Sequence, residues 1–156
     1  MVRAHWAGIY RLMYRLCGHA HDAEELTQET FLRALEKRHQ YQPNTNLRGW
    51  LMRIGTNLFL DAKRRKQRPV QDIAPLHLPD TRSPGEGTPE QQELGRQLET
   101  ALSHLSDVRR AVVVLRGTQD MAFSEIAEVI GTTEATARWH MMQARQELGR
   151  LLDGKV

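Results

Sequence analysis

The sequence is poor in cysteine and in aromatic side chains: it holds one cysteine, Cys17, and aromatic residues make up 6% of its 156 positions. A single cysteine forms no disulfide within the chain, so the sequence predicts a protein of the reducing cytoplasm. No apolar run approaches the about 18 residues of a membrane span, and no signal peptide is recognisable, so we expect no membrane insertion of this chain. Strand-like alternation is missing as well, which predicts an all-α fold.

The residue patterns of common enzymes are also missing. The sequence has no phosphate-cradling glycine motif, no paired-carboxylate arrangement and no nucleophile elbow, so we expect no catalytic residue, no cofactor and no enzymatic activity. Cys17, His19 and His21 stand at a spacing too tight for a structural zinc pair, and no second pair of ligands is nearby. We interpret this run as a turn between helices and expect no metal site.

Charge is distributed unevenly along the chain. Residues 1–68 carry 13 Lys and Arg against 6 Asp and Glu, a net charge of +7. Residues 69–99 carry 2 against 6, and residues 100–156 carry 7 of each sign. The basic first part favours an anionic partner, although a solvated charged face has the same composition.

Proline marks a boundary between two parts of the chain. Five of the six prolines fall between residues 69 and 89. Because such a segment neither continues a helix nor buries much surface, it predicts a flexible linker over residues 67–90. The linker joins two small helical domains, expected at 1–66 and 91–156.

Three helices are predicted in the first domain. In the first, apolar residues recur every three or four positions between residues 2 and 17. Asp22, with Glu25 three residues later, predicts the capped start of the second. A loop over 39–46 precedes the third, whose far end is the basic run 63–66. Its inner side is expected to hold Leu47, Trp50, Leu51, Ile54 and Leu58.

The second domain contains the pattern of a helix-turn-helix. Ser124 is predicted to cap a short helix, Gly131 to end it in the left-handed conformation, and Thr133 to cap the next. Before this motif, residues 94–105 and 112–115 predict two more helices, the first with a stripe of Leu94, Leu98, Ala101, Leu102 and Leu105. Two antiparallel helices without a DNA role fit the same pattern.

The last helix is expected to have a buried face and an outer face. The buried face consists of Ala137, Met141, Ala144, Leu148 and Leu151. On the outer side we expect Glu134, Arg138, His140, Met142 and Arg145.

Both domains resemble the same protein family. The runs 22–35 and 46–58 resemble region 2 of the extracytoplasmic-function sigma factors, and the runs 109–115, 124–131 and 143–148 are similar to region 4 of that family. The resemblance implies a region 2 three-helix bundle and a region 4 helix-turn-helix domain. It also implies an alternative sigma factor that binds core RNA polymerase and initiates transcription at promoters with −10 and −35 elements. Relatives often have a further short helix before the position of Trp6, so we expect either that the start of this chain is misplaced or that its first domain is one helix short.

In the family, the second helix of region 2 binds core polymerase. Acids and amides around an apolar centre suit a protein interface with a polar rim. Leu26 and Phe31 are equally expected as core residues of the domain itself. The residues of this sequence that carry the implied role are Asp22, Glu25, Leu26, Gln28, Glu29, Phe31 and Leu32.

The loop and third helix of region 2 hold the single-stranded −10 element in the family. Aromatic, amide and cationic side chains supply stacking, base-edge hydrogen bonds and phosphate neutralisation. A Trp at helical spacing from Leu47, Leu51 and Ile54 is often a core residue, so Trp50 has two readings. The implied set is Tyr41, Asn44, Asn46, Arg48, Trp50, Arg53, Asn57, Lys63, Arg64 and Arg65.

The double-stranded −35 element is read by the second helix of region 4. The family pattern Thr-Val-Lys/Arg-Ser-Arg is here Thr136-Ala-Arg-Trp-His140, so we expect weak DNA binding by this domain alone or an altered −35 sequence. Trp139 also suits packing on a partner protein or against the first domain. The implied set is Thr133, Thr136, Arg138, Trp139, His140, Met142, Gln143 and Arg145.

The resemblance further implies an anti-sigma factor as a partner. Two other functions fit the residues. One is a stand-alone helix-turn-helix regulator, which binds DNA without polymerase. The other is a sigma-like decoy, which binds an anti-sigma factor and has no promoter-initiating activity.

Overall fold

The computed structural model describes residues 2–43, 45–66 and 87–153, except for the side chains of residues 2, 66 and 153. The chain divides into two compact units, Met1–Leu76 and His77–Val156. Within the described residues all regular secondary structure is helical, which confirms the predicted all-α fold with two helical domains. The domain limits at 66 and 90 stay predictions, and most of the predicted linker lies outside the described residues. No helix in the described part of the chain is long and apolar enough to cross a membrane.

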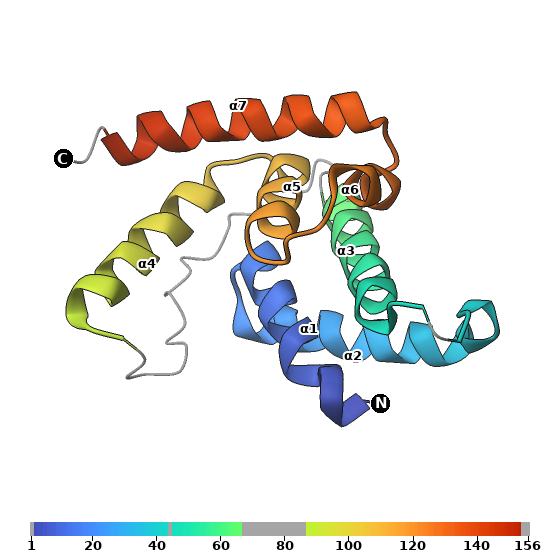
Figure 1. Cartoon of the computed structure of the whole chain (residues 1–156). Coiled ribbons are helices and arrows are strands. Elements are labelled where there is room, and N and C mark those ends of the chain that lie inside the picture. The colour runs from blue at the N-terminus through green and yellow to red at the C-terminus, as the bar shows by residue number, and fades with distance from the viewer. Residues whose placement is uncertain (1, 44, 67–86, 154–156) are drawn as a thin grey trace. The chain divides into compact units, whose positions relative to one another are not determined.

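The first unit is a bundle of the helices α1 (Val2–Cys17), α2 (Ala20–Glu36) and α3 (Leu47–Lys66), each of which contacts the other two (Figure 1). A short 3-10 helix, η1 (Arg38–Gln40), follows α2. Leu12, Met13 and Phe59 are almost fully buried between the three helices. Thr27 and Thr30 are buried as well. Their hydroxyl groups are satisfied there, because each donates a 2.6 Å hydrogen bond to a carbonyl one turn earlier in α2.

Helix α2 begins before the predicted cap. Asp22 was expected to cap it, but the helix starts at Ala20 and its N-cap residue is His19, which makes no side-chain cap hydrogen bond. The reason lies in Gly18, whose φ of 79° turns the chain between α1 and α2. Asp22 instead lies in the first turn, where its carboxylate complements the helix dipole.

Helix α3 buries a different face from the predicted one. Leu51 is fully buried as expected, whereas the other predicted inner residues are only partly buried: Leu47, Trp50, Ile54 and Leu58. The buried face also includes Met52, Gly55, Thr56, Phe59 and Leu60. The prediction missed this face because a glycine and a threonine interrupt its apolar pattern. As a result, the partly buried face of α3 stays open to partners.

Gly55 lets the three helices approach closely. A Cβ atom on Gly55 would lie 2.8 Å from the Cε atom of Met13 in α1 and 3.1 Å from the Oγ1 atom of Thr30 in α2. Met13 and Thr30 are fully buried, so neither has open space to move into. The small residue is therefore required by packing.

We predict that Gly55→Ala lowers the free energy of unfolding by about 1–3 kcal/mol, because the added methyl overpacks the bundle. Gly8→Ala is the matched control: it lies in α1, and a Cβ there meets nothing within 4 Å. Alanine favours the helix, so this variant should gain about 0.5–1 kcal/mol. Denaturant unfolding of the full chain, followed by circular dichroism, measures both changes. Equal changes in the two variants would contradict the packing role of Gly55.

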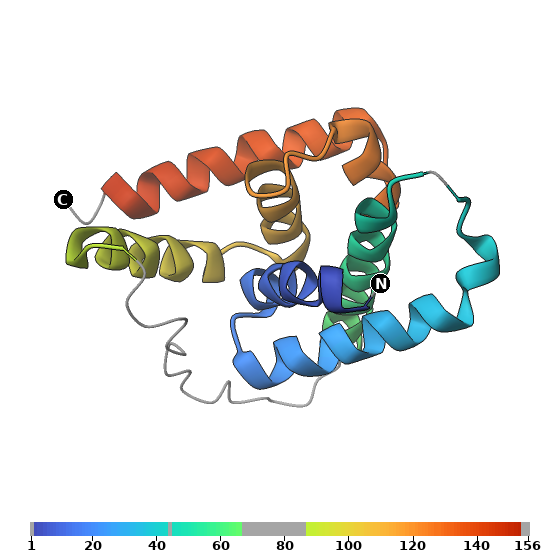
Figure 2. The ribbon, with the colours of Figure 1, turned by 60° about the horizontal axis from the view of Figure 1, so that its bottom comes forward.

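The second unit consists of α4 (Pro89–Ser103), α5 (Asp107–Gly117), α6 (Phe123–Ile130) and α7 (Glu134–Asp153). Helix α7 runs along the unit and contacts α4, α5 and α6 (Figures 1 and 2). Leu102, Leu105 and Ala144 form one buried cluster between α4 and α7. Thr88 caps α4 through a capping box with Gln91, and Ser106 caps α5. The caps fix where these helices begin.

The stripe predicted for α4 is buried at one end only. Ala101, Leu102 and Leu105 are buried, but Leu94 and Leu98 are exposed. The main contact of α4 within the unit is with α7 and involves the C-terminal end of α4 in the cluster above, and Glu99 of α4 also forms a 3.3 Å ion pair with Arg110 of α5. The N-terminal half of α4 therefore presents leucines to solvent.

The turn of the helix-turn-helix has the predicted geometry, except at the start of α6. Gly131 adopts φ 74° and ψ 43° and ends α6, and Thr133 Oγ1 accepts a 3.2 Å hydrogen bond from the backbone N–H of Thr136 at the start of α7. Ser124 does not cap α6, because the chain already turns at Asp120, whose φ is 54°. The N-cap residue is Ala122, without a side-chain hydrogen bond.

Candidate partner-binding groove and nucleic-acid interface

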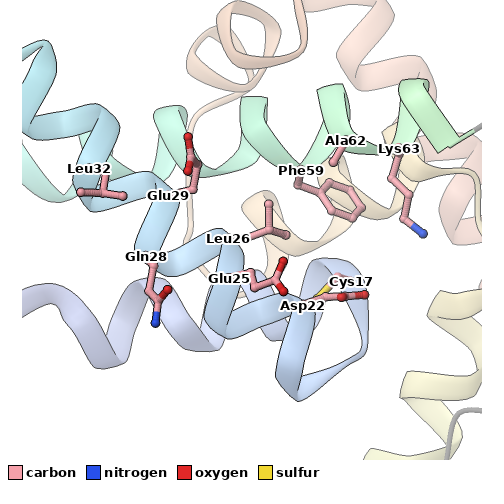
Figure 3. Close-up of a pocket in the computed structure, with 10 residues that line it drawn as sticks. All are labelled: Cys17, Asp22, Glu25, Leu26, Gln28, Glu29, Leu32, Phe59, Ala62 and Lys63. Carbon is pink, nitrogen blue, oxygen red and sulfur yellow. The ribbon is translucent and has the colours of Figure 1, made fainter.

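A groove lies between α2 and α3 of the first unit (Figure 3). Its volume is about 400 Å³. Leu26 and Leu32 from α2 and Phe59 and Ala62 from α3 supply its apolar surface. Leu32 is 58% exposed, so a large apolar side chain stands open at the groove. The groove thus offers an apolar contact to a partner.

The rim of the groove is mainly acidic. Asp22, Glu25 and Glu29 line it, together with Gln28 and a single cation, Lys63. His21 and Arg33 lie on α2 near two of these acids: His21 Nε2 is 2.7 Å from Glu25, and Arg33 is 3.6 Å from Glu29. Both pairs are solvent-exposed and contribute little to stability. The rim therefore attracts a basic partner surface.

The groove contains the residues predicted to bind polymerase, except for Phe31. Phe31 is buried and stacks on Trp6, with ring centroids 5.4 Å apart. Of the two readings of Phe31, core and interface, the structure favours the core. Leu26 is partly buried and still lines the groove.

Sequence reasoning missed the half of the groove that comes from α3. Phe59 and Ala62 were not assigned to it, and Lys63 was assigned to DNA. The spacing of Leu51, Gly55 and Phe59, four residues apart, could have indicated this face of α3, but a glycine at its centre hides the apolar pattern. Cys17 also lines the groove, and its thiol donates a hydrogen bond to the carbonyl of His19 at 3.4 Å. Among the described residues no three His, Cys, Asp or Glu side chains gather as a metal site.

The opposite side of α3 carries a stripe of predicted −10 residues. Trp50, Arg53, Asn57 and Arg64 follow one another at steps of three, four and seven, so they share one side of the helix. Asn57 and Arg64 are exposed, and Trp50 and Arg53 are partly exposed. Arg48 and Lys63 do not belong to this stripe, because their positions fall on the other side of the helix, where Arg48 is exposed and Lys63 is partly exposed at the groove. We call these four residues the α3 stripe.

The loop before α3 places an aromatic pair at one end of the stripe. The ring centroids of Tyr41 and Trp50 are 5.2 Å apart, and the Tyr41 hydroxyl donates a 2.8 Å hydrogen bond to the carbonyl of Thr45. Asn46 accepts a 3.1 Å hydrogen bond from the backbone N–H of Gly49 and so caps α3. Trp50 thus sits in the first turn of a capped helix. The predicted residue Asn44 lies outside the described residues.

The basic end of α3 is solvent-exposed. Arg64 makes a 3.4 Å ion pair with Asp61, and both side chains are more than half exposed. Arg65 is also exposed. An exposed pair of this kind is weak, so Arg64 can exchange Asp61 for a phosphate.

Several of the residues predicted to read the −35 element contact other side chains of the same unit. The Thr133 hydroxyl donates to Thr136 Oγ1 at 3.0 Å. The guanidinium of Arg138 bonds to Glu134 at 2.9 Å and lies 4.6 Å from the centroid of the Phe123 ring. Glu134 therefore pairs with the first cation of the helix.

Trp139 and His140 form a cluster with Arg109 of α5. The guanidinium of Arg109 lies 5.2 Å from the centroid of the Trp139 ring and forms an ion pair with Glu147. Burial, and the nearby charge of Arg109, lower the pKa of His140 below its ordinary value, so the ring is neutral at pH 7. The prediction that His140 lies outside was wrong for its Nδ1 atom, which is buried because the residue borders the buried face of α7. Sequence gave no signal for an ion pair between residues 38 positions apart.

The remaining predicted residues of α7 have the expected exposure, except that Met141, Leu148 and Leu151, expected on the buried face, are only partly buried. Met142 and Arg145 are exposed and Gln143 is partly exposed. Ala137 and Ala144 are fully buried on the opposite side. Helix α7 is thus an amphipathic helix with a mixed apolar and polar outer face.

Comparison with known proteins identifies both units. Residues 1–69 match the model of sigma-70 region 2, and residues 95–148 match that of sigma-70 region 4. The RpoE sigma factor of Bartonella quintana, solved in complex with the anti-sigma factor NepR, has the same fold, with a TM-score of 0.78 at 24% identity over 97% of this chain and 94% of that one.

Two curated relatives set the extent of the similarity. The chain is 42% identical to the ECF RNA polymerase sigma factor SigE of Mycolicibacterium smegmatis over 95% of its own length, but it spans only 58% of the length of SigE. It is 32% identical to the ECF RNA polymerase sigma factor EcfG of Rhodopseudomonas palustris, over 88% of this chain and 75% of the relative. With both regions matched in order, the chain belongs to the extracytoplasmic-function sigma factors of the sigma-70 family.

Proposed function

We propose that this chain is a specificity subunit of RNA polymerase, which binds the core enzyme and directs initiation at promoters with −10 and −35 elements. The observation that carries the proposal is that α3 contributes to two different surfaces. One side of α3 completes an acidic, apolar groove through Phe59, Ala62 and Lys63, and another side presents the α3 stripe. A single helix thus links a protein-binding groove to a nucleic-acid surface.

The groove supplies the contact with the core enzyme. Exposed Leu32 and partly exposed Leu26 offer apolar anchors, and the carboxylates of Asp22 and Glu29 surround them. Interfaces of this kind take most of their energy from a few central anchors, with the polar rim setting orientation. The expected partner surface is therefore a basic segment with apolar side chains at its centre.

The α3 stripe supplies the contact with the opened −10 element. Trp50 and Tyr41 offer aromatic faces on which an unpaired base stacks, and Asn57 offers an amide for a base edge. Arg53 and Arg64 supply positive charge along the same side. These are the elements that a single-stranded nucleic acid requires.

Helix α7 supplies the contact with the duplex −35 element. It is the second helix of a helix-turn-helix, which places its outer face in the major groove. An anti-sigma factor that covers the exposed groove of the first unit is the second partner that we propose, because free sigma-like units expose the surfaces that polymerase and promoter use.

Transcription in a purified system tests the proposed function. The protein is added to core RNA polymerase with a pool of DNA fragments from its own genome, and run-off transcripts are sequenced. We expect transcripts that start downstream of one shared pair of elements and that need both protein and core. Core binding without any promoter-specific transcript would reject the proposal.

One observation favours the decoy as the second candidate. Arg138 and Arg109 both pair with carboxylates, so less positive charge is available for DNA at the outer face of α7, where Arg145 is still exposed. A decoy binds an anti-sigma factor and leaves transcription unchanged, so the same run-off assay separates the two functions.

Phosphate contacts at the end of α3 predict a change in salt dependence. Replacing Arg64 and Arg65 together by Ala should reduce the slope of log affinity against log salt by about 1.5, because each lost contact removes roughly 0.7–0.9. Promoter binding by the holoenzyme, titrated between low and high salt, measures the slope. Arg3→Ala with Arg11→Ala removes the same charge from exposed positions of α1 and should leave the slope unchanged. Equal slopes in both double variants would mean that Arg64 and Arg65 make no phosphate contacts with the promoter.

A further inference from the structure

The outer face of α7 is centred on two exposed apolar side chains. Trp139 is 46% exposed and Met142 is 49% exposed. They lie three residues apart and opposite the fully buried Ala137 and Ala144, so they share the side of α7 that points away from the unit. Exposed side chains of this size are a feature to be explained, because they face water in the free protein.

Two of the cations nearest this pair are engaged in ion pairs, whereas Arg145 lies exposed at the edge of the same face. Arg138 bonds to Glu134 through two guanidinium nitrogens, at 3.2 and 2.9 Å. Arg109 is paired with Glu147, and His140 is neutral. A two-pronged contact of an arginine with guanine needs a free guanidinium, so these residues do not supply it without breaking an ion pair.

Trp139 is held in a fixed orientation. The guanidinium of Arg109 lies over its ring, 5.2 Å from the centroid, and the ring of His140 approaches it edge-on at 5.1 Å. Because two neighbours support the indole, little side-chain entropy is lost when a ligand contacts it. The face is thus prepared for an apolar contact.

Resting on the function proposed above, we propose that α7 reads its duplex element through the C5 methyl groups of thymine, contacted by Trp139 and Met142. In the major groove this methyl is the apolar group by which one base pair differs from the others. An apolar reading face of this kind favours a site rich in A·T pairs. The choice of bases then depends on methyl burial, while the exposed Arg145 stays available for a phosphate.

Replacing thymine by uracil tests this inference, because uracil keeps the pairing and the O4 acceptor and lacks only the methyl. The holoenzyme first selects promoters from a pool that is randomised over the −35 region. Each thymine of the selected element is then replaced by uracil, and promoter binding is measured. We expect about a fourfold loss for each contacted methyl, the value for burying one such group. Uracil in the spacer between the elements should have no effect.

Variants of α7 assign the contact to its residues. In a holoenzyme with Trp139→Ala or Met142→Ala, at least one thymine position of the element should lose its discrimination. At that position the variant should bind the thymine and the uracil promoter with equal affinity. Leu98→Ala changes an exposed apolar residue on α4 of the same unit and should keep the full discrimination. Circular dichroism of each variant establishes that it is folded.

The outcomes separate this inference from the function on which it rests. A selected element without thymine, or equal binding of thymine and uracil promoters by the unaltered holoenzyme, would overturn the inference while transcription stands. Discrimination that survives in both Trp139→Ala and Met142→Ala would also overturn it, and would leave Trp139 free for a partner protein. Absence of any promoter-specific transcript would reject the proposed function itself.

Discussion

Replacing Leu32 by arginine is expected to weaken binding of core RNA polymerase by about 30-fold or more, as loss of a central interface anchor does. Leu32 lines the groove between α2 and α3 and is 58% exposed, so its replacement leaves the bundle core intact. The variant also adds a positive charge where the acidic rim attracts a basic surface. Titration of labelled core enzyme with the protein measures the change.

Leu35→Arg is the matched control for this prediction. Leu35 lies on the same helix and is 44% exposed, but it does not line the groove. This variant makes the same chemical change outside the proposed contact and should bind core within about twofold of the unaltered protein. If both variants lose affinity equally, the groove is not the docking site.

Trp50→Ala is expected to reduce binding of a single-stranded −10 oligonucleotide to the holoenzyme by about 5- to 100-fold, the range for one lost base-stacking contact. Trp50 is partly exposed, pairs with Tyr41 and begins the α3 stripe. Formation of the open promoter complex should fall in parallel, because unpaired bases lose their support. Core binding should not change, since Trp50 does not line the groove.

Two further variants separate stacking from a structural role of Trp50. Trp50→Tyr keeps an aromatic face and should restore most of the oligonucleotide binding. Trp139→Ala removes an exposed Trp from the other unit and should leave binding of the −10 oligonucleotide unchanged. A loss in Trp50→Tyr as large as in Trp50→Ala, or a loss of core binding, would mean that Trp50 serves the fold instead.

The helices could be predicted from the sequence because their periodicity is local. The predictions were wrong where packing between helices determines the start of a helix or its buried face. The cap of α2 was placed at Asp22, although the left-handed Gly18 had already turned the chain. The face of α3 was misplaced because Gly55 and Thr56 are buried for reasons of close approach, which an apolar pattern does not register.

The candidate sites were predictable to the same degree. The α2 side of the groove follows from the family resemblance and its local sequence, and all of its predicted residues except Phe31 line the groove. Phe59 and Ala62 enter it only through the packing of α3 on α2. On α7, the contacts of Arg109 with Trp139 and Glu147 join residues far apart in sequence, so their effect on the reading face required the structure.

We propose that the two helical units hold promoter DNA together only when they are mounted on core RNA polymerase. Footprinting of one selected promoter with the protein alone, with core alone and with both tests this claim most directly. We predict protection of the −35 and −10 elements, and strand opening at −10, only in the presence of both. Equal protection of both elements by the protein without core would contradict the account.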